Sequence, residues 1–325
     1  MALSADPEGR LQGQVVSVDS AVALGRALVD NLSRVLLGAP AAVEAAVIAA
    51  LSGGHLLIED VPGVGKTTLA RALASSLGAE LSRIQGHPDL LPADITGVSV
   101  FSSADGSWKF RPGPVFAHVV LVDELNRTPP RTQSALLESM EEQQVTVDGE
   151  TWPLLSPYLV VATQNPHSQL GTFPLVASQL DRFALCTTVG YPDPATEARL
   201  VHHQGGKFAL PAIERVCDTS GWLAAQKATG SVVVSPAVGD YAVALTRATR
   251  GAAGVRLGAS PRASIWLIRT AQAHAVLLGR RYVVPDDVKA VAAACLAHRL
   301  STDDGVEQAR AVVARVLEAT PSPRP

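Results

Sequence analysis

Cysteine is scarce in this sequence, with 3 residues among 325. Cys186, Cys217 and Cys295 stand far apart and show none of the usual spacings of a thiolate metal site. An odd, sparse count is typical of a reducing compartment, where cysteine behaves as a small buried hydrophobic residue. The 8 histidines also lack ligand spacing, so we expect no metal site built from cysteine or histidine.

Long apolar runs and a basic excess are also missing. The best apolar run, Ala41 to Leu51, is about half the length of a membrane-spanning helix and contains Glu44. Residues Met1 to Gln14 include Asp6 and Glu8 and no apolar core, so we expect no secretory signal and a cytoplasmic protein. A net charge of −3 disfavours a protein that coats duplex nucleic acid, although a local basic patch stays open.

What the sequence does contain is an ordinary globular composition, 47% hydrophobic and 18% charged, in a chain long enough for two domains. Over about 140 residues from the first predicted strand, short apolar runs alternate with helical patterns, which predicts a doubly wound, mostly parallel sheet. The predicted strands are His55–Glu59, Glu80–Gln85, Val119–Val122, Tyr158–Ala162 and Phe183–Val189. The predicted helices are Val18–Leu37, Pro40–Leu51, Thr67–Leu77 and Thr132–Glu142.

Two segments interrupt this alternation with β-hairpin signals. Val98–Phe110 alternates around Ala104-Asp105-Gly106, and Gln143–Leu155 alternates around Val147-Asp148-Gly149-Glu150. Asp-Gly between β-forming residues is a strong turn signal. We expect Trp108, on the first hairpin, to pack beneath it rather than to contact a partner protein.

From about Pro192 the strands are expected to stop. We expect a flexible lead-in over residues 1–16, an α/β domain over 17–191, a small all-α domain over 192–320 and a tail over 321–325. The helices predicted after residue 192, several introduced by proline, are Pro194–Gln204, Pro236–Thr249, Ser264–Leu278, Pro285–Leu300 and Gly305–Ala319.

The strongest chemical signal is a glycine-rich loop between a predicted buried strand and a predicted helix. It matches the phosphate-binding pattern G-x-x-x-x-G-K-[ST] except at the first glycine, where Asp60 stands. The backbone N–H groups that hold phosphates come from the later part of such a loop, so this departure is minor. We expect Lys66 to reach the β- and γ-phosphates of ATP and the Thr67 hydroxyl to bind Mg²⁺. The predicted ATP or ADP contacts are Asp60, Val61, Pro62, Gly63, Val64, Gly65, Lys66, Thr67 and Thr68.

Polar residues also follow two later strands. Asp123 and Glu124 emerge from the apolar run Val119–Val122, at the edge where doubly wound sheets place ligands. We expect Asp123 to hold Mg²⁺ through water and Glu124 to orient and deprotonate the attacking water. Asn165, after the next strand, offers an amide to the γ-phosphate or to that water.

Two arginines carry weaker signals. Arg182 stands just before a predicted strand and, taken alone, is a surface residue or a partner of Asp181. Arg262 lies in the first turn of a helix whose N-cap is Ser260, where a positive charge opposes the helix dipole. Arg262 therefore needs an anionic partner, and a bound phosphate and a nearby carboxylate are equal alternatives.

These residues, in this order, resemble the AAA+ ATPases and, within them, the MoxR family. The likeness covers about residues 17 to 300, and the aspartate in place of the first P-loop glycine is similar to what MoxR proteins carry. The most specific strings are Glu59–Thr67, Asp89–Gly97, Phe110–Pro114, Asp123–Arg127, Gln133–Glu138, Ala162–Pro166, Gln179–Phe183 and Gly258–Arg262.

The resemblance implies roles for individual residues. It makes Asn165 sensor 1, Arg182 an arginine finger that reaches the γ-phosphate in a neighbouring subunit, and Arg262 sensor 2, which links the helical lid to the nucleotide. An arginine supplied by a neighbour implies a homo-oligomeric ring, most simply a hexamer. The resemblance also makes Pro88–Pro114 a helix-2 insert and places the segment around Leu36-Leu37-Gly38 against the adenine.

The family likeness also implies a function. We expect an ATPase that acts as a chaperone-like motor, remodelling or maturing a separate partner protein, including by metal or cofactor insertion. That partner would carry a von Willebrand factor A domain, as partners of this family often do. The alternatives are a nucleotide-gated scaffold with little turnover, a magnesium-chelatase-like motor and a nucleic-acid motor. Intact Asp123, Glu124, Asn165 and Arg182 disfavour the scaffold, and the acidic net charge disfavours the nucleic-acid motor.

Overall fold

The computed structural model describes residues 17–104, 106–166, 171–202, 213–303 and 305–323. A central sheet of five parallel strands has the order β2-β5-β8-β1-β9, as predicted for a doubly wound fold. The predicted lead-in over residues 1–16 lies outside the described residues. The strands of the sheet are β1 (Leu56–Glu59), β2 (Leu81–Gln85), β5 (Val119–Asp123), β8 (Leu159–Gln164) and β9 (Leu185–Thr187).

Helices cover both faces of the sheet because side chains along each strand point alternately to opposite sides. Leu56 and Ile58 pack into one hydrophobic cluster, while Leu57 between them packs into the other. Each fully buried side chain of this size stabilises the fold by about 1.5–3 kcal/mol. The first face is covered by α2 (Pro40–Ser52) and α3 (Lys66–Ser76), against which α1 (Val18–Ser33) packs, and the second by α5 (Pro130–Glu142).

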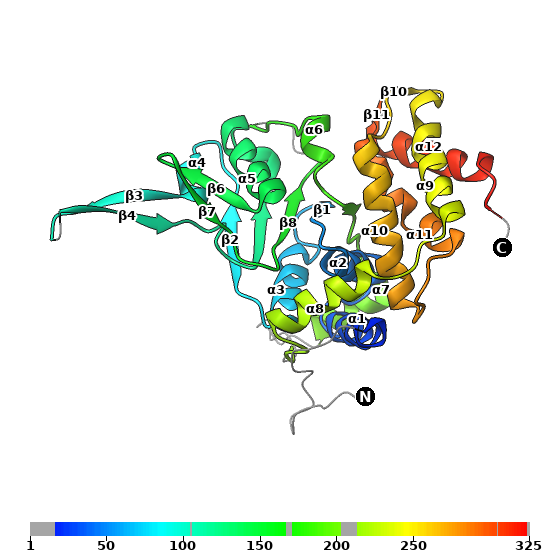
Figure 1. Ribbon diagram of the computed structural model, residues 1–325, viewed down its shortest axis with the longest axis horizontal. Coiled ribbons are helices and arrows are strands. Elements are labelled where there is room, and N and C mark those ends of the chain that lie inside the picture. The colour runs from blue at the N-terminus through cyan, green and yellow to red at the C-terminus, as the bar shows by residue number, and fades with distance from the viewer. Residues whose placement is uncertain (1–16, 105, 167–170, 203–212, 304, 324–325) are drawn as a thin grey trace.

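Both predicted hairpins are confirmed, and the first projects far from the body of the molecule (Figure 1). The Trp108 side chain on it is 71% exposed and touches Phe101, which is 52% exposed, edge to face. The expectation that Trp108 packs beneath the hairpin is therefore wrong, because the outer part of the hairpin extends beyond the body. The hairpin strands are β3 (Gly97–Ser102) with β4 (Ser107–Pro112), preceded by α4 (Pro92–Thr96), and β6 (Gln144–Val147) with β7 (Glu150–Pro153).

From α7 onward the chain forms a helical lid that also contains a short ribbon. β10 (Val255–Leu257) pairs with β11 (Ser301–Thr302), so the expectation that strands stop near Pro192 is wrong for these two segments. The described part of the predicted helix Pro194–Gln204 ends at His202. The lid helices are α7 (Pro194–His202), α8 (Thr219–Gly230), α9 (Pro236–Ala248), α10 (Pro261–Leu277), α11 (Pro285–Leu296) and α12 (Gly305–Ala319). Short helical turns are α6 (Ala177–Leu180), η1 (Leu125–Arg127), η2 (Thr249–Gly251) and η3 (Ala297–Arg299).

Both of the first two helices of the chain pack against the lid, and α2 also packs against the sheet. Trp222 of α8 is fully buried and donates its indole N–H to the Ala50 carbonyl of α2 at 2.9 Å. Leu28 of α1 and Leu267 of α10 belong to the same hydrophobic cluster. One continuous core thus joins the lid to one face of the sheet. Among the described residues, no helix combines the length and apolar character that crossing a membrane requires.

Candidate functional site

The glycine-rich loop of residues 60–67, the P-loop, joins the carboxyl end of β1 to the start of α3. Gly63 and Gly65 have φ of +87° and +101°, a region that favours glycine. Because α3 begins at Lys66, its first N–H groups have no partner within the helix and are available to an anion. The loop borders a cavity of about 290 Å³ that is also lined by Leu36–Ala39 and Val189–Pro192. The predicted contact between Leu36–Gly38 and a nucleotide base is compatible with this arrangement.

Lys66 is the first residue of α3, directly after the loop, and has acidic groups around it. Its Nζ donates a hydrogen bond to the Asp60 carbonyl at 2.7 Å. Partial burial lowers the pKa of Lys66 from its ordinary value, while Asp60, Asp123 and Glu124 act in the opposite direction. A triphosphate here would offer the ammonium group stronger acceptors than a single carbonyl.

Thr67 and Asp123 place two side-chain oxygen atoms near each other beside the loop. Thr67 Oγ1 lies 3.5 Å from Asp123 Oδ2, and Thr163 Oγ1 lies 3.5 Å from Asp123 Oδ1. A hydroxyl and a carboxylate next to bound phosphates are the donors that Mg²⁺ takes, with water filling its other positions. These residues fit the ion, which would neutralise charge on the phosphate oxygens when bound. In the described part of the chain, no group of three or more His, Cys, Asp and Glu could hold a metal ion without phosphate.

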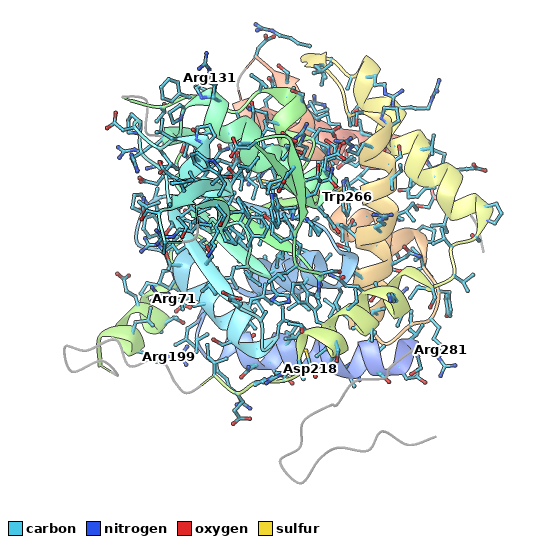
Figure 2. The ribbon with its side chains drawn as sticks, turned by 60° about the vertical axis from the view of Figure 1, so that its left-hand side comes forward. Arg71, Arg131, Arg199, Asp218, Trp266 and Arg281 are labelled. Carbon is cyan, nitrogen blue, oxygen red and sulfur yellow. The ribbon has the colours of Figure 1, made fainter. Side chains whose placement is uncertain are left out.

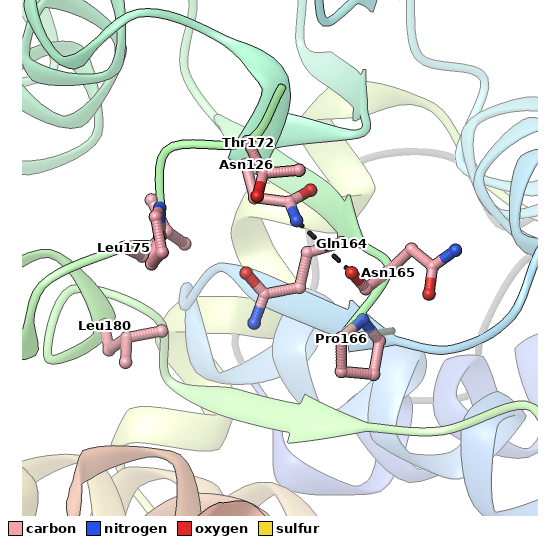
Figure 3. A pocket seen from close by; sticks show the side chains of 8 residues that line it. Asn126, Gln164, Asn165, Pro166, Thr172, Leu175 and Leu180 are labelled. Atoms are coloured by element: carbon pink, nitrogen blue, oxygen red, sulfur yellow. Dashed lines mark hydrogen bonds between the residues drawn. The ribbon is translucent and has the colours of Figure 1, made fainter. Parts of the chain in front are cut away.

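Glu124 and Asn165 leave the same edge of the sheet. Glu124 has φ of 55°, uncommon for a residue other than glycine, and its N–H donates to Thr163 Oγ1 at 3.0 Å. Asn126 Nδ2 donates to the Asn165 carbonyl at 3.3 Å, and both residues line a cavity of about 360 Å³. Figure 3 shows the side chains of Gln164 and Asn165 leaving the strand in opposite directions. The structure thus brings Lys66, Glu124 and Asn165 to one edge.

Arg182 lies at the other end of the sheet. It precedes β9, and all five strands run parallel, so it sits at the amino edge, whereas the P-loop follows β1 at the carboxyl edge. Arg182 Nη2 is 3.2 Å from Glu141 Oε2, and Arg262 Nη2 donates to Glu141 Oε1. A cavity of about 310 Å³ contains both arginines and shares no lining residue with the P-loop cavity. The anionic partner of Arg262 is therefore a carboxylate here, and the structure does not bring Arg262 to its own P-loop.

Two segments of the sequence match known protein families. Most of its length is similar to individual known proteins. Residues 55–185 match the family described as "ATPase family associated with various cellular activities (AAA)", and residues 247–317 match the AAA lid domain. YeaC, an uncharacterized protein of Bacillus subtilis, is 43% identical over 92% of this chain and 95% of its own. Chaperone MoxR1 of Mycobacterium tuberculosis is 38% identical over 90% of this chain and 79% of its own.

Protein MoxR of Methylorubrum extorquens is 31% identical over 90% of this chain and 93% of its own. The crystal structure of a suspected ATPase from Cytophaga hutchinsonii superposes with a TM-score of 0.84 at 32% identity, over 94% of this chain and 97% of that one. The chain belongs to the MoxR family of AAA+ ATPases. The match to separate AAA and lid families agrees with the α/β core and helical lid described above.

In this MoxR chain, Arg182 and Arg262 are held side by side by a buried tether. The carboxylate of Asp181 accepts hydrogen bonds from Ser260 Oγ at 2.9 Å and from Arg299 Nε at 2.9 Å. Arg299 is 3% exposed and also donates to the carbonyl of Phe183. Because Ser260 is the N-cap of α10, which carries Arg262, the tether fixes the position of one arginine relative to the other.

Arg269 extends this arginine cluster along α10. It lines the same cavity as Arg182 and Arg262, and its guanidinium lies over the ring of Trp266, 5.4 Å from the centroid. Figure 2 shows Trp266 where α10 faces the core, and its ring packs on Gly54 just before β1. Arg269 and Glu141 were not predicted from the sequence, since helical spacing alone does not reveal which residues meet across domains.

At the carboxyl edge of the MoxR chain, two residues that contact Asp123 and Glu124 were not predicted from the sequence. Arg83 Nε donates to Asp123 Oδ2 at 2.7 Å, and Gln85 Nε2 lies 3.5 Å from Glu124 Oε2. Both belong to β2, two residues apart and therefore on one side of the strand. That spacing was visible in the sequence, but only the pairing of β2 with β5 brings them to the acidic pair.

Proposed function

We propose that this MoxR-family chain hydrolyses ATP in a homo-oligomeric ring. The observation that carries the proposal is the division of charged groups between opposite edges of one sheet. The P-loop, Asp123, Glu124 and Asn165 lie at the carboxyl edge, and the two paired arginines lie at the amino edge. A complete site then needs the amino edge of a neighbouring chain, and head-to-tail contacts of this kind form a ring when the rotation between subunits closes. Six subunits is the number that the family likeness favours.

Each residue at the carboxyl edge has a proposed task. The backbone of residues 60–68 and Lys66 hold the phosphates, and Thr67 and Asp123 hold Mg²⁺, Asp123 through water. Glu124 orients and deprotonates the attacking water, and Asn165 contacts the γ-phosphate or that water. In such a reaction the protein supplies position and charge stabilisation more than covalent chemistry.

Arg182 and Arg262 complete the site of the next chain in this proposal. Both side chains are partly exposed, and they share one carboxylate, Glu141, so the pair keeps an excess of positive charge. The γ-phosphate of a neighbour would draw both guanidinium groups from Glu141. We therefore assign Arg262 to a neighbour's nucleotide rather than to the nucleotide of its own chain.

We further propose a chaperone-like motor role in the cytoplasm, remodelling or maturing a separate partner protein, including by metal or cofactor insertion. A relative that is 38% identical bears the name chaperone. The β3–β4 hairpin projects from the body of the molecule (Figure 1). Its exposed Phe101 and Trp108 offer apolar surface to a protein client. We also propose that the partner protein carries a von Willebrand factor A domain. The proposed domain bounds of the chain are residues 17–191 for the α/β domain and 192–320 for the lid.

The test is steady-state ATP hydrolysis against protein concentration for the native chain, Glu124→Gln and Arg182→Ala. We expect turnover that rises more than linearly with concentration and falls at least about a hundredfold in both variants. Arg256→Ala is the matched control, since Arg256 is exposed and pairs with Asp303 in the lid ribbon region. Hydrolysis that is indifferent to Glu124→Gln and Arg182→Ala would remove the catalytic assignment.

The client role has its own test. The Glu124→Gln chain, held in its ATP state, should retain a partner protein in a pull-down that the Lys66→Ala chain, which cannot hold the phosphates, does not retain. Replacing Phe101 and Trp108 by serine together should reduce that retention without reducing ATP binding. Equal recovery with all chains would count against the motor role.

A nucleotide-gated scaffold with little turnover is the second candidate. It is favoured by the way in which charged groups pair within the single chain. Lys66 bonds to the Asp60 carbonyl, Arg83 to Asp123, and Arg182 to Glu141. If ATP drives assembly at concentrations where turnover stays negligible, this candidate takes precedence.

A further inference from the structure

The aspartate that replaces the first glycine of the P-loop pattern makes contacts that glycine could not make. Asp60 Oδ2 accepts hydrogen bonds from the N–H groups of Val189 and Gly190, both at 2.7 Å. Asp60 Oδ1 accepts another from the N–H of Val61 at 2.8 Å. Hydrogen bonds to an ionised acceptor are about twice as strong as neutral ones. The Asp60 carboxylate is thus directed at backbone N–H groups, including two from a distant part of the sequence.

The two distant residues form the corner where the chain leaves the sheet for the lid. Gly190 follows β9, precedes α7 and has φ of +77°, a conformation that glycine adopts without strain. Asp60 fastens this corner to the loop that would hold the phosphates. The phosphate loop and the segment that leads into the lid are therefore joined through one side chain.

The same corner is a wall of the P-loop cavity. Val189, Gly190 and Tyr191 line the cavity together with Leu36 and the P-loop glycines. The Tyr191 side chain is 78% exposed, although it borders a pocket. An exposed aromatic ring beside a phosphate-binding loop is a surface on which a planar base stacks. The wall that Asp60 holds is therefore suited to a nucleobase, together with the Leu36–Gly38 segment that lines the same cavity.

We propose that Asp60 is a positioning residue that makes the phosphate loop and the base-binding wall one unit, so that the affinity for ATP depends on the base. The inference rests on the proposed function, because it concerns the same nucleotide site. Without the carboxylate, the wall keeps its covalent connections but loses the side-chain bonds to the loop. The phosphates would still meet the backbone N–H groups of residues 63–67, whereas the base would meet a wall that is no longer fixed.

The experiment compares the binding of magnesium ATP and magnesium tripolyphosphate by calorimetry, in a Glu124→Gln background that prevents hydrolysis. Tripolyphosphate has the three phosphates and lacks the base and ribose. Asp60→Gly restores the general P-loop pattern, and Asp60→Asn keeps the size of the side chain without its charge. Asp193→Asn is the matched control, since Asp193 lies in the same connection but accepts from Ala195 and Thr196 instead.

We expect Asp60→Gly to raise the Kd for ATP about tenfold and to change the Kd for tripolyphosphate less than twofold. Asp60→Asn should raise the Kd for ATP by a smaller factor, and it carries the test alone if Asp60→Gly does not fold. Asp193→Asn should leave the ratio of the two affinities unchanged. Equal weakening of both ligands, or no weakening of ATP, would overturn the inference. If the Glu124→Gln parent binds neither ligand, the proposed function itself fails.

Discussion

The two edges of the central sheet are built in different ways. At the carboxyl edge, each functional group follows the strand that presents it, as Lys66 follows β1 and Glu124 follows β5. At the amino edge, Glu141, Arg182 and Arg262 come from three separate segments, the end of α5, the approach to β9 and the start of α10. The main functional groups of the carboxyl edge are therefore placed by strand ends, whereas those of the amino edge depend on how the lid is docked.

Mixing two inactive variants tests most directly whether the two edges of one site come from different chains. Glu124→Gln chains lack the group that activates water but keep both arginines, and Arg182→Ala chains keep the carboxyl edge but lack the finger. Each alone should lose at least about a hundredfold in turnover. In a random equal mixture about one interface in four joins an intact carboxyl edge to an intact arginine, so about a quarter of native turnover should return.

Double variants provide the control for that mixture. Chains that carry both Glu124→Gln and Arg182→Ala should restore no turnover when mixed with either single variant. A mixture with Glu124→Gln contains no chain with Glu124, and a mixture with Arg182→Ala contains no chain with Arg182. Turnover that stays absent in the equal mixture of single variants would show that both edges act within one chain, contrary to the topology of the sheet.

The buried tether behind the arginines is the next difference between the edges. Arg299→Met removes a guanidinium that is almost fully buried and leaves the Asp181 carboxylate with Ser260 as its side-chain donor, without a charged partner. Breaking a buried pair of this kind costs about 3–5 kcal/mol. Chemical denaturation should show a loss of that size, while Arg256→Met, at an exposed pair, should change stability by less than about 0.5 kcal/mol. A small loss in both would mean that Asp181 finds other donors.

Lowering the pH should reduce the stability of the fold through His55, which lies at the amino edge of the sheet. Its Nδ1 accepts the N–H of Val160 at 3.0 Å, its Nε2 is 3.0 Å from the Met140 carbonyl, and full burial lowers its pKa from 6.5 to about 4. The folded chain thus binds the proton more weakly than the unfolded chain, and the stability that the neutral ring contributes is lost as pH falls below 6.5. The loss attributable to His55 should reach about 2 kcal/mol at pH 5.

Denaturation at pH 7 and pH 5 measures this effect. The His55→Gln chain should be less stable than the native chain at pH 7 but should lose less stability on going to pH 5. The comparison between the two chains is needed because burial also lowers the pKa of His298. If the native chain and His55→Gln lose equal amounts, the proton is bound elsewhere.

The contrast between the edges also explains what the sequence could predict. The carboxyl edge was predictable because an apolar run followed by a polar residue marks the end of a buried strand, as at Asp123. The second role of Asp60 was not, since its partners lie 129 and 130 residues away and depend on how β9 meets the P-loop. Helix α8 was missed although Asp218 caps it, because its hydrophobic pattern is weak and irregular. Glu141 was unpredictable, since only tertiary packing brings the end of α5 to Arg182.

The smallest expected effect concerns Glu141. It tests whether Glu141 binds Arg182 and Arg262 until a neighbour's phosphates replace it. Three arginines and one carboxylate line the cavity at the amino edge, and Glu141 competes with a neighbour's phosphates for Arg182 and Arg262. Replacing it by glutamine strengthens the positive field that faces the next chain. The protein concentration at half-maximal turnover should fall about threefold, equivalent to roughly 0.6 kcal/mol. Glu142→Gln, one residue on and exposed, should leave that concentration unchanged. A rise for Glu141→Gln would instead make Glu141 a residue that positions the arginines, and the amino edge would then be as preorganised as the carboxyl edge.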